Sequence, residues 1–209
     1  GYVAKRPGDL VEVDVKDVEI VPGVRVKHFS ARDVVSKWDV LEAHKRATAK
    51  AAAKFLDSVQ ARMPFKVRVI QVDGGSEFCG EFERECERRG IMLIVLPPRS
   101  PKLNGGVEGS IRTHTEEFYE VAELDWRVSG LNRQLLEQER VYNEVRPPQA
   151  LGYLSPQQWL EKYWSECDKE DEPRGGYPNG PPPVWRQYNV STLPTISQQP
   201  IRQTIACHT

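Results

Sequence analysis

The most constraining feature of the chain is a strand, helix, strand succession between residues 66 and 97. Residues 66–73, KVRVIQVD, are rich in β-branched side chains, and residues 91–97, IMLIVLP, are apolar almost throughout. Between them, residues 81–90, EFERECERRG, form a charged helix with Gly90 just past its end. Two strands joined through a helix pair in parallel within one sheet. The segment therefore predicts a parallel βαβ unit and places the chain in the α/β class.

Three more strands are predicted before this unit. Residues 10–20, LVEVDVKDVEI, alternate apolar and polar side chains, as a half-buried strand does. Two β-rich runs follow at residues 24–35 and 38–45, so the three are expected to form an antiparallel meander. An alanine-rich helix over residues 48–63 has Thr48 as its N-cap. The expected fold is a mixed five-stranded sheet flanked by helices, in which the strand ending at Asp73 lies parallel and adjacent to the first strand.

The C-terminal part is predicted to be helical and then disordered. Residues 97–106 are rich in proline and glycine, so the next helix can begin only after Gly106. Further helices are predicted over residues 131–145 and 155–164, the second with Ser155 as its N-cap. We therefore expect a core domain over residues 1–164 and a disordered Pro/Gly-rich tail over residues 165–209. The apolar stripes expected on the first two helices are Val107, Ile111, Phe118 and Val121, and Leu131, Leu135, Val141 and Tyr142.

Charge and cysteine content exclude several classes of protein. The formal net charge is −1 and the pI about 6.5, so a nucleic-acid partner has to be argued from local sites. The four cysteines show no zinc-ligand spacing, and the chain contains no secretory or membrane-spanning apolar run. A reducing cytoplasm is the expected location. The chain starts without a methionine, which suggests a piece of a longer protein.

Three carboxylates stand out by their placement. Asp14 lies in the middle of the first strand, Asp73 ends the strand expected beside it, and Glu108 lies in the first turn of the helix after Gly106. Acidic side chains from different elements then converge at one edge of the sheet, where binding sites of α/β proteins tend to form. Such a cluster is costly unless a cation neutralises it, and oxygen ligands without His or Cys favour Mg²⁺ or Mn²⁺.

Simpler interpretations stay open for each of these residues. Asp73 with Gly74 is a common turn dipeptide, in which glycine supplies a positive φ. Glu108 and Arg112 are spaced to form an exposed i,i+4 ion pair.

Several stretches resemble, in order and spacing, one known family. They are GDLVEVDVK, QVDGGSEF, PPRSPKLNGGVEGSIRTHTEEFYE and YNEVRPPQALGYLSPQQWL, and together they cover roughly residues 6–164. They resemble the catalytic core shared by retroviral integrases and the DDE transposases of bacterial insertion sequences. The resemblance implies a ribonuclease-H-like fold. It also implies a catalytic and metal-binding triad of Asp14, Asp73 and Glu108 that holds two Mg²⁺ (or Mn²⁺) ions, since Asp33 and Asp39 lie outside the first strand.

The implied function is DNA transposition or integration by a DDE polynucleotidyl transferase, through metal-dependent 3′-end cleavage and strand transfer. DNA is the implied partner. A homodimer or larger complex is expected because two element ends must be held together, and the setting is the nucleoid of a bacterial cytoplasm. Around Glu108, Arg99, Lys102 and Arg112 form either a phosphate-contacting patch or a solvated loop, and Asn104 either contacts DNA or caps a turn.

The chain also departs from the family pattern. Gly106 and Gly109 replace larger residues beside the glutamate, Ile111 precedes Arg112, and Pro148 replaces a histidine. Glycines in the first turns of a helix weaken it, by about 1–2 kcal/mol for two of them. A catalytically impaired or domesticated DNA-binding relic, and a ribonuclease-H-type nuclease, are therefore the alternatives.

Overall fold

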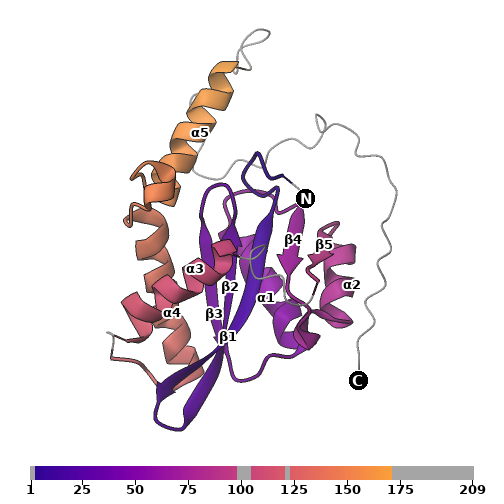
Figure 1. The fold of residues 1–209 in the computed structure, drawn as a ribbon, viewed down its shortest axis with the longest axis vertical. Coiled ribbons are helices and arrows are strands. Elements are labelled where there is room, and N and C mark those ends of the chain that lie inside the picture. The colour runs from indigo at the N-terminus through magenta and orange to yellow at the C-terminus, as the bar shows by residue number, and fades with distance from the viewer. Residues whose placement is uncertain (1–2, 98–104, 121–122, 171–209) are drawn as a thin grey trace.

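The structure, a computed structural model, contains one mixed β-sheet with helices on both faces (Figure 1). It describes residues 3–97, 105–120 and 123–170. Strands β1, β2 and β3 form an antiparallel meander, and β4 and β5 continue the sheet in parallel with β1. This confirms the predicted meander, the parallel unit and the position of β4 beside β1. In spatial order the five strands are β3 (Asp39–His44), β2 (Val24–Asp33), β1 (Val11–Val21), β4 (Val69–Val72) and β5 (Met92–Val95).

Helices α1 (Ala49–Arg62) and α2 (Glu81–Arg88) cover one face of the sheet. The side chain of Thr48 accepts the Ala51 N–H at 3.1 Å, so the predicted N-cap of α1 is confirmed. Gly90, just past α2, has φ +66°, a conformation that glycine adopts at helix ends without steric cost. The core under this layer consists of buried apolar residues that include Val11, Val13, Phe29, Phe55, Leu56, Ile70, Val72, Phe82 and Cys86.

Helices α3 (Gly105–His114) and α4 (Val128–Glu144) cover the opposite face. The chain leaves α3 through a π-turn, η3 (Thr115–Tyr119), and short 3₁₀ turns form η1 (Ser76–Phe78) and η4 (Gln149–Leu151). Helix α5 (Pro156–Glu170) extends beyond the sheet at the top of Figure 1, and Ser155 Oγ accepts the Gln158 N–H at 3.3 Å at its start. The apolar cluster of this layer includes Val18, Ile20, Leu41, Ala43, Phe118, Leu131 and Leu135.

Polar side chains of α4 complete the hydrogen bonding of the edge strand β3. Asn143 accepts the Asp39 N–H at 2.9 Å and donates to the Asp39 carbonyl at 2.8 Å. Asn132 makes the same pair of bonds with Ala43, at 2.7 and 2.9 Å. An uncovered edge strand presents unpaired main-chain groups to other chains. Helix α4 therefore protects this edge as well as burying apolar side chains.

Three sequence expectations about the helices are corrected. Helix α3 begins at Gly105, before the predicted start, because first-turn N–H groups need no partner within the helix. Val141 is 37% exposed, because the sheet-facing row of α4 is partly polar and includes Glu139 and Asn143. Helix α5 continues past the predicted end at residue 164 through Glu170, since no proline or glycine interrupts this stretch.

Other expectations hold or lie outside the described part. Val107, Ile111 and Phe118 are buried as predicted, and Val121 lies outside the described residues. Residues 171–209 of the predicted tail over residues 165–209 also lie outside them, so the domain boundary stays a prediction. No disulfide joins the cysteines within the described part. None of the helices described here is long and apolar enough to span a membrane.

Candidate active site

Asp14 and Asp73 lie next to each other at one end of the parallel pair β1–β4. Val13 is in register with Val72, and each aspartate is the next residue of its chain segment. The two valines are buried under α1 and α2. Because successive side chains of a strand point to opposite faces, the Asp14 carboxylate is directed to the face that carries α3, and Asp73 directly follows the end of β4 beside it. The predicted placement of these two residues thus follows from the strand register.

Glu108 lies in the first turn of α3, above the same face, and its side chain is exposed. Burial is the largest cause of a raised pKa at Asp14, which reaches about 6. The negative charges of Asp73, Glu108 and Glu77 raise that pKa further. The structure therefore brings the predicted triad within electrostatic reach of Asp14, together with a fourth carboxylate that the sequence interpretation did not single out.

The carboxylates of Asp14, Asp73 and Glu108 are suitable ligands for a divalent cation, but they are not close enough together to bind one jointly. Within residues 3–97, 105–120 and 123–170, no group of three or more His, Cys, Asp and Glu side chains is close enough to hold a metal ion. Carboxylate oxygens are nevertheless the ligands that Mg²⁺ and Mn²⁺ prefer. An ion held jointly by Asp14, Asp73 and Glu108 would therefore require these side chains to move closer together.

Asp73 also has a turn role. It is exposed, and its Oδ1 accepts the Gly75 N–H at 3.1 Å. Neither Gly74 nor Gly75 has a positive φ, so the expected reason for glycine in this turn is wrong. A Cβ on Gly75 would lie 2.9 Å from Cδ of Glu77. Glycine at this position therefore leaves room for the carboxylate of Glu77, the fourth acidic residue near Asp14.

Glu12 is a residue of this region that sequence reasoning missed. It lies two positions before Asp14 on the same face of β1, is 7% exposed, and its Oε2 accepts the Val107 N–H at 2.8 Å. A Cβ on Gly106 would lie 2.5 Å from that oxygen. The glycine that departs from the family pattern thus admits a carboxylate to the N-terminus of α3, where the helix dipole favours negative charge. The spacing of two residues between Glu12 and Asp14 could have indicated from the sequence that both side chains lie on the same face of the strand.

Asp33 and Asp39 have structural partners. Asp33 is buried, and its Oδ1 accepts the Gly8 N–H at 2.8 Å while Oδ2 binds Ser36 at 2.6 and 2.8 Å. Asp39 is buried and paired with Arg32, which with the other neighbours holds its pKa below the usual value despite burial. Both assignments agree with the choice of Asp14 as the first member of the triad.

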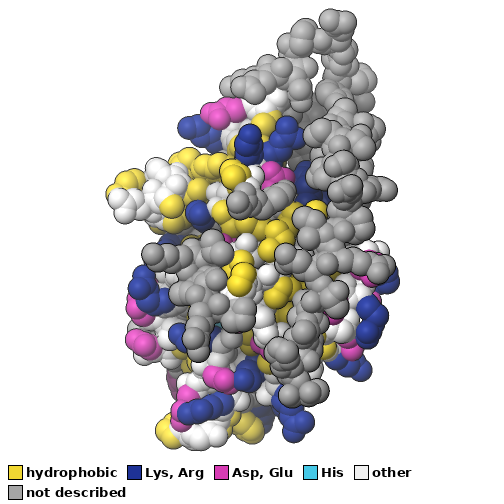
Figure 2. All heavy atoms as spheres, turned by 45° about the vertical axis from the view of Figure 1, so that its right-hand side comes forward, with side chains coloured by type: hydrophobic (Ala, Val, Ile, Leu, Met, Phe, Trp, Pro, Cys, Tyr) yellow, Lys and Arg dark blue, Asp and Glu magenta, His cyan; other side chains and the backbone are white. Residues whose placement is uncertain are grey.

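The predicted DNA-contacting residues are described only in part. Arg99, Lys102 and Asn104 lie outside the described residues. Arg112 is exposed on α3, one turn after Glu108, and the i,i+4 ion pair between the two is not formed in the described chain. In Figure 2, lysine and arginine side chains are interspersed with acidic ones on the coloured surface. This distribution matches the near-neutral net charge of the chain.

The sheet order and the helix positions identify the fold by comparison. The chain matches the catalytic core domain of BIV integrase with a TM-score of 0.58 and 18% identity, over 77% of this chain and 99% of that one. The chain has the fold of an integrase catalytic core. The intasome of simian T-cell lymphotropic virus, solved with PP2A regulatory subunit B56 gamma, gives a TM-score of 0.64 at 17% identity, over 87% of this chain. Our chain spans 62% of that chain.

A sequence comparison supports the same assignment. Residues 89–156 match the family model described as integrase core domain. The matched segment includes Glu108 and Arg112, whereas Asp14 and Asp73 precede it. No curated protein matches the sequence. The predicted ribonuclease-H-like fold of an integrase-type core is thus confirmed.

Proposed function

We propose that the chain is the catalytic core of a DDE polynucleotidyl transferase that cuts the 3′ ends of a DNA element and joins them to target DNA. The observation that carries this proposal is the position of Asp14 on β1 beside the end of β4, which Asp73 directly follows, with Glu108 acting on Asp14 from the first turn of α3. The integrase core assignment supports it.

The three carboxylates are proposed to hold two Mg²⁺ or Mn²⁺ ions. When bound, such ions stabilise negative charge on the attacking and leaving oxygens of a phosphoryl transfer. Because the pKa of Asp14 is raised to about 6, this carboxyl would have to lose its proton before it could hold an ion, so cation binding would be favoured above about pH 6.

The proposed reaction consists of two phosphoryl transfers on DNA. Water attacks the phosphodiester at the element end and releases a 3′-OH, which then attacks a target phosphodiester and expels a new 3′-OH. Both steps are in-line displacements that require the protein mainly to position groups and neutralise charge. Arg112, exposed one turn after Glu108, is placed to bind a phosphate near the reacting group. Two copies of the chain are expected to hold the two ends.

The test is joining of a labelled DNA duplex, carrying the ends of the encoding element, to a plasmid in the presence of Mn²⁺. Asp73→Asn should abolish joining. Asp17→Asn is the matched control, because Asp17 is exposed on β1 and pairs with Lys27 at 2.7 Å, away from the triad. It should leave joining unchanged.

Two other outcomes would refute the proposal. Cleavage of the RNA strand of an RNA–DNA hybrid without DNA joining identifies a ribonuclease-H-type nuclease. DNA binding with neither reaction identifies a relic of a transposase that retains only the fold.

A further inference from the structure

Helix α3, which carries Glu108, is bound to the sheet through one row of its residues. Gly106, Ser110 and His114 are spaced four apart and therefore lie on one face of the helix. The Gly106 carbonyl accepts a hydrogen bond at 3.2 Å, Ser110 Oγ donates one at 2.6 Å, and His114 Nε2 forms one at 2.9 Å. Ser110 and His114 are fully buried. All three bonds lead to the same two side chains of the sheet.

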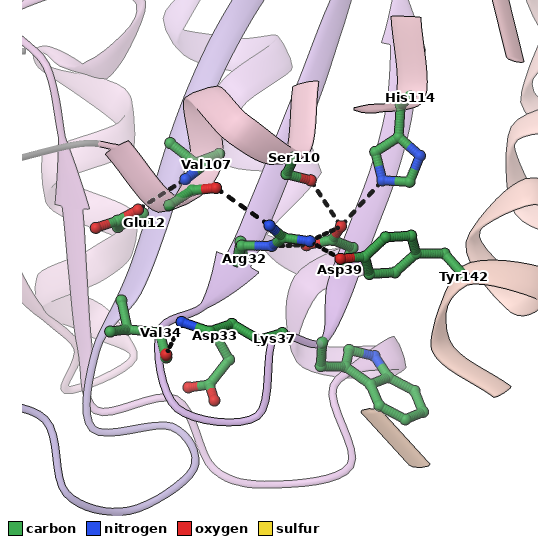
Figure 3. A network of polar contacts seen from close by, with 12 residues as sticks. Glu12, Arg32, Asp33, Val34, Lys37, Asp39, Val107, Ser110, His114 and Tyr142 are labelled. Carbon is green, nitrogen blue, oxygen red and sulfur yellow. Dashed lines mark hydrogen bonds and ion pairs between the residues drawn. The ribbon is translucent and has the colours of Figure 1, made fainter. Parts of the chain in front are cut away.

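Those two side chains are Arg32 and Asp39, which form a buried bidentate ion pair (Figure 3). The Nε–Oδ1 and Nη2–Oδ2 distances are 2.8 and 2.9 Å. Asp39 Oδ2 also receives the bonds from Ser110 and His114, while Arg32 Nη1 donates to the Gly106 carbonyl. Such planar pairs specify geometry as well as charge. The pair therefore fixes both the height and the rotation of α3 over the sheet.

Glu12 adds a third charged group in the same row of the sheet. It is in register with Arg32 across β1–β2, and Arg32 is in register with Asp39 across β2–β3. Its Oε2 accepts the Val107 N–H at the start of α3. The row of Glu12, Arg32 and Asp39, called the clamp row below, lies two residues before Asp14 on β1, or about 7 Å along the strand.

The clamp row is itself held from α4. The Tyr142 hydroxyl contacts Arg32, and Asn143 binds the Asp39 main chain. A buried charge is costly unless it is paired and hydrogen-bonded, and removal of one partner leaves the other uncompensated. Because Arg32 and Asp39 each have several hydrogen-bond partners, this pair has little freedom to shift. The position of the clamp row therefore determines the position of α3, which is hydrogen-bonded to it.

We propose that Glu12, Arg32 and Asp39 are positioning residues that set the place of Glu108 over Asp14 and Asp73. This inference rests on the proposed function for its consequence in catalysis, but the anchoring of α3 can be measured separately. None of the three needs to touch DNA or the reacting atoms. They act through α3, by fixing the main chain on both sides of Glu108 at Gly106, Val107 and Ser110.

The test compares two serine-to-alanine variants of the full chain. Ser110→Ala removes a hydroxyl that donates to Asp39 from α3. Ser58→Ala removes a hydroxyl of α1 that donates to Glu42 at 2.5 Å, on the other side of the sheet. Both lose one bond to a carboxylate, but Ser110 is fully buried and Ser58 half-buried, so Ser110→Ala should cost more global stability, and urea unfolding measures that difference separately. Only the first should loosen α3.

Two readouts separate anchoring from general destabilisation. Amide hydrogen exchange of residues 105–114 should be on the order of tenfold faster in Ser110→Ala than in the parent, and unchanged in Ser58→Ala. The Mn²⁺ concentration for half-maximal DNA joining should rise about three- to tenfold in Ser110→Ala alone, because Glu108 is then less well placed to bind the ion. DNA affinity should stay constant.

The outcomes distinguish the two proposals. A parent that joins no DNA refutes the proposed function, and hydrogen exchange still decides the anchoring of α3. If the two alanine variants behave alike in hydrogen exchange, the clamp row does not anchor α3. If exchange differs but the Mn²⁺ dependence of an active enzyme does not, α3 is anchored there without positioning Glu108. Either result overturns the inference.

Discussion

A glycine-to-alanine change at residue 106 should destabilise the protein, although alanine is the better helix former. The added Cβ would lie 2.5 Å from Oε2 of Glu12, which is closer than real contacts allow. The Glu12 side chain is flexible, but swinging it away breaks its bond to the Val107 N–H. A hydrogen bond to a charged group contributes about 1.5–3 kcal/mol, against at most about 1 kcal/mol gained from helix propensity. The net loss expected is about 0.5–2 kcal/mol.

A double-mutant cycle with Glu12→Ala isolates this contact. Without the Glu12 carboxylate, the methyl group added at position 106 meets no obstacle, so Gly106→Ala should then stabilise by up to about 1 kcal/mol through helix propensity. The coupling energy is therefore about 1.5–3 kcal/mol, well above the roughly 0.3–0.5 kcal/mol scatter of independent sites. Urea unfolding followed by circular dichroism measures all four proteins.

Gly109→Ala is the matched control, since nothing lies within 4 Å of a Cβ at that position of α3. It should stabilise by about 0.5–1 kcal/mol whether or not Glu12 is present. Additive effects of Gly106→Ala and Glu12→Ala, or a stabilising Gly106→Ala in the parent, would refute the account of this contact. Alanine is thus expected to destabilise the protein at position 106 and to stabilise it at position 109, although both glycines depart from the family pattern.

Three further outcomes are expected. Because the pKa of Asp14 is raised from 3.8 to about 6, the folded state binds this proton more tightly than the unfolded state, and the parent loses stability as the pH rises through that interval. Asp14→Asn should remove this loss, so the melting temperature of the variant in EDTA should rise relative to the parent between about pH 4 and 6 and stay constant relative to it above pH 6. A difference in melting temperature that does not change with pH would contradict the raised pKa. Asn143→Ala should cost about 2–3 kcal/mol in urea unfolding, because it leaves the buried N–H and C=O of Asp39 without partners, whereas Asn132→Ala at a half-buried site should cost about half as much. Arg112→Ala should reduce the slope of log DNA affinity against log salt by about one, with Arg25→Ala on the β1–β2 hairpin unchanged as control; equal slopes would remove Arg112 from the DNA site.

The glycines near Glu108 are not sufficient evidence of a decayed element. From the sequence alone, Gly106 and Gly109 both weaken the helix that carries the glutamate. In the folded chain, Gly106 admits the Glu12 carboxylate to the helix N-terminus, and the loss of propensity is offset by that bond. Gly109 has no such contact, so a loosening effect remains only there. Activity measurements on Gly109→Ala would show whether it matters.

What the sequence determined by itself is local or periodic. The alternation of residues 10–20, the caps at Thr48 and Gly90, and the parallel βαβ unit all follow from backbone and burial preferences within a few residues, and the fold class follows from their order. Asp14 and Asp73 could be paired in advance, because strand parity and the ends of parallel strands set their positions.

Only the tertiary structure decided which polar residues support the carboxylates. Glu12, Arg32 and Asp39 come from three strands, and their partners Ser110, His114 and Tyr142 lie more than 70 residues further along the chain. No short sequence window contains both sides of these contacts, and a charged residue in a strand is ordinarily expected to be exposed. The same reason explains why Val141 is partly exposed and Glu139 is buried. Glu139 accepts a hydrogen bond from the main chain of β3 at Leu41, and apolar periodicity along α4 does not predict this contact. Hydrogen bonding across a buried interface is a property of the packed layers, and it appears only when strand register and helix position are both known.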